Sequence, residues 1–203
     1  MSLSAELPGP ALAAGLAVLA SASWPGTRAD GLPAVAGFVT SGFSPLVAAV
    51  ADLCLTRYFG EPPAAPEYGA RTALVLTSTT GDLVTSAAIA EAVQAGRRVP
   101  PLLFYQSNHN AVAGYVAARW ELRGPMACTM PCGSAGAAAL DQAMTDGAAS
   151  AALLVADGDA DAALVIAANC YLDGTVCGEA MILGPASWPS RHGRGPAALK
   201  GMR

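Results

Sequence analysis

Residues Leu102–Leu140 decide how the chain folds, and they read LLFYQSNHNAVAGYVAARWELRGPMACTMPCGSAGAAAL. A helix that closes at Arg123–Pro125 leads into a short strand over Met126–Met130. The strand then breaks at the small residues Cys132–Gly136, and an alanine-rich helix continues from there to about Val155. A residue delivered from a strand to the first turn of a helix meets unpaired amides and the positive end of the helix dipole. Such an elbow is typical of a site that holds negative charge or an activated nucleophile.

The rest of the chain alternates strands and helices. Apolar runs bounded by turn residues predict further strands at Gly15–Ser23, Arg71–Ser78, Asp161–Asn169 and Val176–Leu183. Helices are expected between the strands, and the expected N-caps are Ser44, Asp82 and either Ser107 or Asn108. Pro100-Pro101 are expected to open an extended piece. This alternation predicts βαβ crossovers and an α/β fold, with a mostly parallel mixed sheet that carries helices on its faces.

Length and composition indicate one domain. The chain has 203 residues, of which 53% are hydrophobic and 13% charged. We expect a loose N-terminus over 1–13, one domain over 14–184 and a disordered tail over 185–203, where basic residues, Gly and Pro gather. The net charge of −4 argues against nucleic-acid binding, and no apolar run reaches the roughly 20 residues of a spanning helix. The five cysteines form no CxxC pair, which favours reduced thiols in a cytoplasmic protein.

Two polar segments resemble ligand-binding loops, but neither has the residues that such a loop requires. A calcium loop begun at Asp157 needs Gly at 162 and Glu at 168, and both positions are alanine. Ser78–Asp82 follows a strand and opens a helix, as phosphate-binding loops do, but it has one glycine and no lysine. We interpret both segments as structural turns and expect no metal site.

Three segments resemble the N-terminal half of β-ketoacyl synthases, which have the thiolase fold. They are SNHNAVAGYVAARWELRGP, the elbow, and CGEAMILGP, and their order and spacing are similar to that family from about Ala34 to Leu183. The resemblance implies the N-terminal half of a thiolase-like fold. Those enzymes carry a nucleophilic cysteine on the first turn of the elbow helix, and counted from the Gly-Pro that position is Gly133. Their catalytic histidines and lysine belong to a C-terminal half, so His109 and His192 match no catalytic position.

The neighbours of Gly133 are weaker candidates for catalysis. Cys132 stands one residue earlier, and because side chains alternate along a strand, its sulfur is expected to point away from the acyl pocket. It is therefore a fallback nucleophile only. Ser134 is better explained as an N-cap or first-turn residue.

A ketosynthase-like chain without the cysteine resembles the chain-length-factor subunits of type II polyketide systems. Truncated members of this kind are similar to the chain-length-factor subunits of aryl-polyene pathways. The resemblance implies a catalytically silent subunit that forms a heterodimer with a full-length ketosynthase and shapes its acyl tunnel, in polyketide or fatty-acid-like chain elongation. It implies no cofactor in this chain, because an acyl carrier protein presents the acyl chains to the partner on its phosphopantetheine.

The same resemblance places residues at the dimer interface and along the tunnel. In ketosynthase dimers the strand before the elbow, here Met126–Met130, pairs with its counterpart across the two-fold axis. The residues expected at the interface and tunnel are Phe104, Tyr105, Asn108, Asn110, Met126, Cys128 and Met130.

Two other functions stay open at this point. One is an acyltransferase or ketosynthase-like enzyme that uses Cys132, with histidines lent by a partner. The other is a homodimeric acyl-binding or scaffold protein.

Overall fold

The computed structural model describes residues 11, 15–24, 29–132 and 138–188, and its centre is a five-stranded sheet. The strands, in the order in which they lie in the sheet, are β1 (Leu16–Ser23), β5 (Val176–Pro185), β4 (Ala162–Cys170), β2 (Thr72–Thr77) and β3 (Met126–Thr129). β2 pairs in parallel with β3 and β4, whereas β5 pairs antiparallel with β4 and β1. The expected α/β class and mixed sheet are confirmed, with β5 running against the other four strands.

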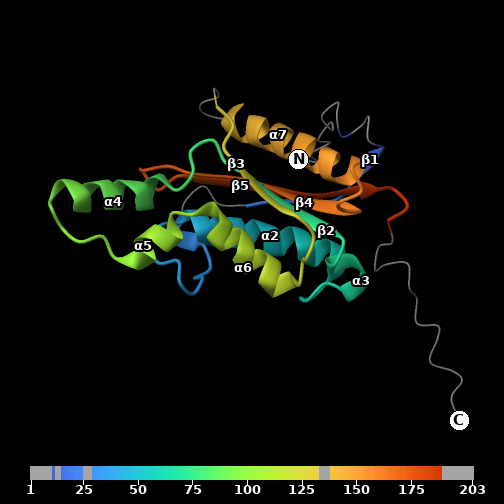
Figure 1. Ribbon diagram of the computed structural model, residues 1–203, viewed down its shortest axis with the longest axis horizontal. Coiled ribbons are helices and arrows are strands. Elements are labelled where there is room, and N and C mark those ends of the chain that lie inside the picture. The colour runs from blue at the N-terminus through green and yellow to red at the C-terminus, as the bar shows by residue number, and fades with distance from the viewer. Residues whose placement is uncertain (1–10, 12–14, 25–28, 133–137, 189–203) are drawn as a thin grey trace, which may run out of the picture.

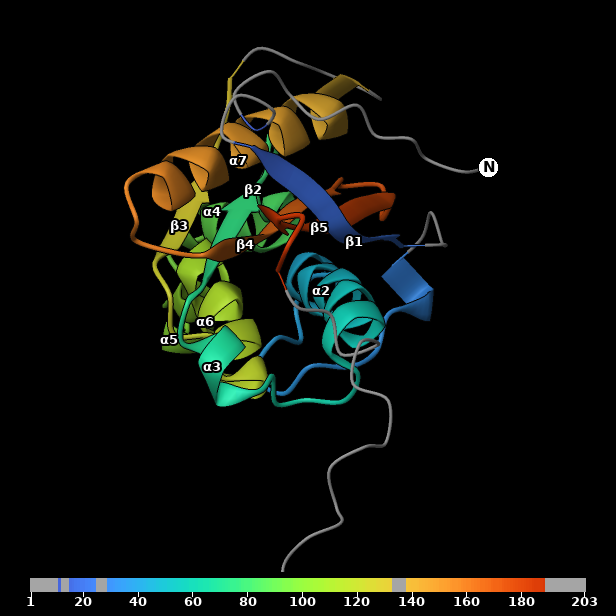
Figure 2. The same ribbon diagram turned by 90° about the vertical axis from the view of Figure 1, so that its right-hand side faces the viewer.

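Helices cover both faces of this sheet. They are α2 (Phe43–Phe59), α3 (Pro66–Gly69), α4 (Leu83–Gln94), α5 (Pro101–Gln106), α6 (His109–Trp120) and α7 (Ala138–Ala156), with one 3-10 turn, η1 (Ala29–Gly31). Figure 2 shows α2 and α6 on one face and α7 on the other. α4 lies at one end of the molecule, beyond the sheet, and α5 leads back from it (Figure 1).

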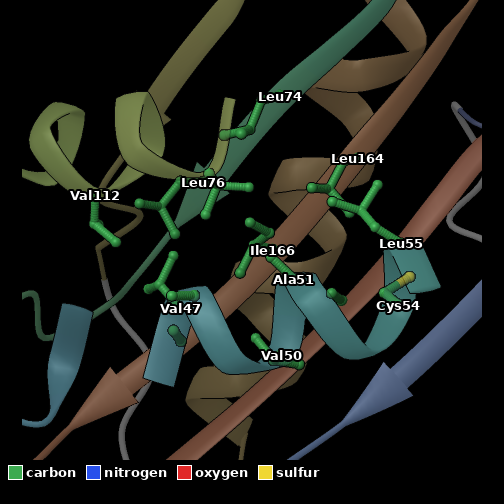
Figure 3. Close-up of a cluster of buried hydrophobic side chains, with 14 of the residues drawn as sticks. Val47, Val50, Ala51, Cys54, Leu55, Leu74, Leu76, Val112, Leu164 and Ile166 are labelled. Carbon is green, nitrogen blue, oxygen red and sulfur yellow. The ribbon is translucent and has the colours of Figure 1, made fainter. Parts of the chain in front are cut away.

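The larger core lies between the sheet and α2. Almost every residue of α2 is buried, because the helix lies against the sheet on one side and contacts α6 on another. Leu164 and Ile166 of β4 point into this core, beside Val47 and Val50 of the helix (Figure 3). On β5, a Cβ added at Gly178 would lie 3.1 Å from the side chain of Leu46, so glycine lets the helix approach closely.

The smaller core lies under α7 and is built mainly from alanine and valine. Alternate residues of β4, among them Val165, face α7, as the period of a strand requires. A Cβ added at Gly147 of α7 would lie 2.7 Å from Cγ1 of Val165 and 3.1 Å from Oγ1 of Thr77. Small residues on the inner side of α7 therefore bring its backbone close to β2 and β4.

The structure corrects two expected element boundaries. Ser44 is not the N-cap of α2, because the helix begins at Phe43, whose backbone N–H donates to Oγ of Ser41 at 3.0 Å. Pro100-Pro101 do not open an extended piece, because Pro101 begins α5. Proline is accommodated at that position because the first helical N–H has no partner within the helix.

The two C-terminal strands were expected, but their pairing was not. β4 and β5 form a hairpin in which the N–H of Tyr171 donates to the carbonyl of Thr175 at 2.9 Å. Gly174 takes a φ of 79° in this turn, so Asp173-Gly174 is the sequence signal for a hairpin. Beyond β5, Trp188 packs on Tyr68 with ring centroids 5.8 Å apart. Of the tail expected over 185–203, Pro185 ends β5, and residues 189–203 lie outside the described residues.

Candidate functional site

An open hollow of about 360 Å³ lies where β2 and β3 end, between α4 and the junction of α5 with α6. Its lining is mostly polar and consists of Thr80, Gly81, Asp82, Ser86, Ser107, Asn108, His109, Asn110, Cys128 and Met130. In open α/β sheets, ligands bind beyond the carboxyl ends of the strands. The hollow is therefore the candidate functional site.

Asn169, at the end of β4, organises the turn that forms one wall. Its side chain is fully buried, and its Oδ1 accepts from Oγ of Ser78 at 3.0 Å and from the N–H of Thr79 at 3.0 Å. The N–H and hydroxyl of Thr80 lie 3.4 and 3.2 Å from the same oxygen. The N–H of Gly81 donates to Oγ of Ser78 at 2.8 Å. Protein atoms thus occupy the donors that a phosphate-binding loop would offer, which agrees with a structural turn.

Two helices start at the hollow, and a side chain caps each of them. Oδ1 of Asp82, which is 5% exposed, accepts from the N–H of Thr85 at 3.0 Å and caps α4. Oδ1 of Asn108 accepts from the N–H of Asn110 at 3.0 Å and caps α6. Both predicted caps are confirmed, and each uses one oxygen of its side chain.

His109 packs against two neighbouring residues from its place in the first turn of α6. Its ring stacks on Phe43 with centroids 4.9 Å apart. On another side, Nε2 lies 3.0 Å from the position that a Cβ on Gly81 would take. Burial lowers the pKa of His109, and the nearby Asp82 carboxylate only partly opposes this shift. The imidazole is therefore mainly neutral near pH 7, where it can donate from one nitrogen and accept at the other.

Cys128 contributes a thiol to the hollow, and that thiol is not activated. Burial raises the pKa of Cys128 to about 11. Since the thiolate is the reactive form, this sulfur is a poor nucleophile at neutral pH. The described part of the hollow is thus suited to binding, with no group prepared for covalent chemistry.

β3 is the last strand of the sheet, and its outer edge is free of other described strands. The carbonyl of Pro125 accepts from the N–H of Leu74 in β2, and that of Thr129 accepts from the N–H of Ser78, directly after β2. Because the two sides of a strand alternate, the backbone groups of Met126 and Cys128 point to the outer edge. Met126 is 46% and Met130 55% exposed. A free, partly apolar edge of this kind can accept another strand.

The structure brings some of the expected interface residues together and separates others. Asn108, Asn110, Cys128 and Met130 line the hollow. On α5, Phe104 is 73% and Tyr105 51% exposed. Tyr105 also packs on Phe38 at 5.7 Å between ring centroids, so part of its ring belongs to the core.

The elbow itself lies mostly outside the described residues. Gly133 and Ser134 fall in the gap at 133–137, so their expected roles stay predictions. Cys132 precedes this gap and is exposed, and it is absent from the lining of the hollow.

The acidic turn expected over 157–161 is tied to the sheet by Arg71. Nη2 of Arg71 donates to Oδ1 of Asp161 at 2.9 Å and to the carbonyl of Gly158 at 2.8 Å. Within the described residues, no three His, Cys, Asp or Glu side chains gather closely enough to hold a metal ion. None of the helices described is both long and apolar enough to cross a membrane.

One family of proteins matches the sequence of this chain. The family model for the β-ketoacyl synthase N-terminal domain matches residues 64–177, more than half of the chain. The chain belongs to this family. The matched part runs from the start of α3 through the hollow and the elbow to the beginning of β5.

Solved structures show the same fold at low sequence identity. The ishigamide ketosynthase/chain length factor matches with a TM-score of 0.61 and 18% identity, over 81% of this chain and 49% of that chain. A ketosynthase (ApeO) in complex with its chain length factor (ApeC) from Xenorhabdus doucetiae matches with a TM-score of 0.55 and 16% identity, over 77% and 63%. A β-ketoacyl synthase from Burkholderia phymatum STM815 matches with a TM-score of 0.55 and 15% identity, over 86% of this chain and 53% of that chain. No curated protein matches the chain.

The chain spans about half to two thirds of the length of these structures. At this identity they establish the thiolase-like ketosynthase fold. The expected family and fold class are thereby confirmed.

Proposed function

We propose that this chain is a catalytically silent, chain-length-factor-like subunit that pairs with an active ketosynthase and shapes its acyl tunnel. The observation that carries the proposal is the position of the hollow. It lies beside the free edge of β3, and four residues that the family resemblance assigned to the interface and tunnel line it, namely Asn108, Asn110, Cys128 and Met130. A partner strand added to this edge would cover the side of the hollow next to β3.

Catalytic silence is supported by the chemistry of the described groups. Cys128 has a raised pKa, and His109 packs between Phe43 and Gly81. In the proposed complex the partner supplies the nucleophile, and an acyl carrier protein delivers the acyl chain on its phosphopantetheine.

The pairing is tested through the outward backbone of β3. The chain is co-expressed with a full-length ketosynthase encoded in the same genome, and a 1:1 complex is expected on co-purification. Cys128→Pro removes the outward N–H without disturbing the bonds to β2, and it should abolish the complex. Cys128→Ala keeps that N–H and should retain the complex. A chain that stays monomeric beside every such ketosynthase would contradict the proposal.

The second candidate function is an enzyme that uses Cys132, with an imidazole contributed by the partner. The exposure of Cys132, directly beyond β3, favours it. Cys132→Ala in the reconstituted complex separates the two functions. Elongation should be unchanged for a silent subunit and lost for an enzyme that depends on this thiol.

A homodimeric acyl-binding or scaffold protein is the remaining alternative. It predicts self-association of the chain alone at micromolar concentration and no need for a ketosynthase. Analytical ultracentrifugation of the isolated chain distinguishes it from the proposed heterodimer.

A further inference from the structure

The lining of the hollow is unusual for a surface that would receive a hydrocarbon chain. Hydroxyl groups come from Thr80, Ser86 and Ser107, and further polar groups from Asp82, His109 and Asn110. Ligand sites are normally lined mainly by apolar side chains, with a small number of polar groups that fix orientation. This hollow has the opposite balance.

The charges of the hollow exclude two kinds of ligand. An anion would meet the carboxylate of Asp82, which is almost fully buried and therefore weakly screened. A simple cation would meet the positive ends of α4 and α6, both of which begin at the hollow. His109 adds no charge near pH 7, because its pKa is lowered. The balance favours an uncharged ligand.

The hydrogen-bonding groups that line the hollow limit the class of ligand further. Covering these hydroxyl and amide groups with methylene groups would remove their water and return no hydrogen bonds. An alkyl chain is therefore a poor ligand here. The hydroxyls of Thr80 and Ser107 already donate to protein oxygens. A hydroxyl or carbonyl oxygen of a ligand can instead accept from the Ser86 hydroxyl or the Asn110 side-chain amide, and a ligand hydroxyl can donate to Asp82 or to the neutral His109.

We infer that the hollow binds the oxygen-bearing part of an uncharged chain, with hydroxyl or keto groups, in preference to a saturated alkyl chain. That this ligand is the growing acyl chain in a partner's tunnel rests on the proposed function. The chemical preference itself belongs to the side chains of this subunit. It is therefore measurable without a partner.

The test compares two probes on the isolated full chain labelled with ¹⁵N. The probes are the 5-hydroxyhexanoyl and hexanoyl thioesters of N-acetylcysteamine, which differ by one hydroxyl. The dissociation constant of each probe is obtained from the amide chemical shifts of Gly81 and Asn110. The hydroxylated probe should bind about two- to tenfold more tightly, the range that one net hydrogen bond provides. Equal affinities, a preference for hexanoyl, or shifts confined to residues outside the hollow would overturn the inference.

Substitutions at two exposed positions show whether the lining determines the preference. Ser86→Leu with Asn110→Leu removes two polar side chains from the lining and leaves the caps at Asp82 and Asn108 in place. This double variant should lose the preference or reverse it toward hexanoyl. Gln94→Leu, at the exposed end of α4 and outside the hollow, is the matched control and should keep the wild-type preference. An unchanged preference in the double variant would contradict the inference.

The outcome is independent of partner binding. A chain that fails to bind any ketosynthase but still prefers the hydroxylated probe contradicts the proposed function alone. A chain that forms the complex but shows no preference between probes contradicts this inference alone.

Discussion

The imidazole of His109 stacks on the ring of Phe43, with centroids 4.9 Å apart and planes inclined by 30°. Phe43 is fully buried at the start of α2, and His109 is in the first turn of α6. The contact therefore joins the core helix to the wall of the hollow. It also explains why burial is the main cause of the lowered pKa of His109.

We expect NMR titration of the imidazole to give His109 a pKa below 6.5, the usual value. Because the unfolded chain then binds the proton more readily, neutral His109 stabilises the fold above about pH 6.5. That contribution is lost as the pH falls from 6.5 through the lowered pKa. Urea unfolding of wild type and His109→Phe at pH 7.5 and 5.5 isolates the effect, since the variant keeps the ring contact but lacks the titration. A His109 pKa at or above 6.5 would contradict the burial seen here.

Asp82→Asn should lower the pKa of His109 further. The Asp82 carboxylate favours the protonated imidazole, so removing its charge withdraws that support. Asparagine still caps a helix, and α4 should stay intact by circular dichroism. Asp157→Asn, in the exposed turn beyond α7, is the control and should leave the His109 titration unchanged. An unchanged pKa in Asp82→Asn would mean that the carboxylate does not act on this ring.

Asp52→Ala should destabilise the fold by about 1–3 kcal/mol, the usual cost of leaving a buried donor unpaired. Nε1 of the fully buried Trp120 donates to Oδ1 of Asp52 at 2.6 Å, and Nε of Arg119 lies 3.1 Å from the same carboxylate. Asp52→Asn keeps an acceptor and should cost less. Glu91→Ala breaks an exposed ion pair with Arg97 and should change the free energy of unfolding by less than about 1 kcal/mol. Equal effects of Asp52→Ala and Glu91→Ala in urea unfolding would contradict this account.

Residue patterns with a single physical cause predicted most of the fold. The uninterrupted apolar run of β2 matches a strand buried on both faces. Asp82 and Asn108 were recognisable as caps because Asp and Asn are strong N-cap residues ahead of apolar helices. The cap at Ser44 was wrong because several neighbouring residues satisfy the same helix signal. The extended piece at Pro100-Pro101 was wrong because proline also fits the first turn of a helix, where Pro101 lies.

The polar wall of the hollow was harder to predict, because it depends on contacts between distant parts of the chain. Asn169 bonds to the turn at Ser78 across 91 residues. Asparagine in a strand gives no local sign of such a partner. The sequence did indicate Asn108, Asn110, Cys128 and Met130, through the family resemblance. Ser86 belongs to no motif, and only the folded chain brings it to the same hollow.

The five cysteines should differ widely in reactivity. Cys132 is exposed, whereas burial raises the pKa of Cys54 to about 12 and of Cys170 to about 11. Timed iodoacetamide labelling with peptide mass spectrometry should show Cys132 modified first and Cys54 last. Because exposure alone produces this order, the rate of Cys132 relative to N-acetylcysteine is the informative quantity. A silent subunit predicts a rate no higher than that of the free thiol, and a rate more than about tenfold higher favours the enzyme alternative.

Two glycines test, as a pair, how closely α7 lies against the sheet. In Gly147→Ala, the new Cβ would lie 2.7 Å from Cγ1 of Val165, so α7 must shift or the core must strain. Overpacking of this kind typically costs about 1–3 kcal/mol. Gly114 is also inside a helix, α6, but a Cβ there meets nothing within 4 Å. Gly114→Ala should therefore stabilise the chain by about 0.5–1 kcal/mol through helix propensity alone. Opposite signs in urea unfolding would confirm that α7 packs directly on β2 and β4, whereas stabilisation by both substitutions would mean that α7 lies further from the sheet.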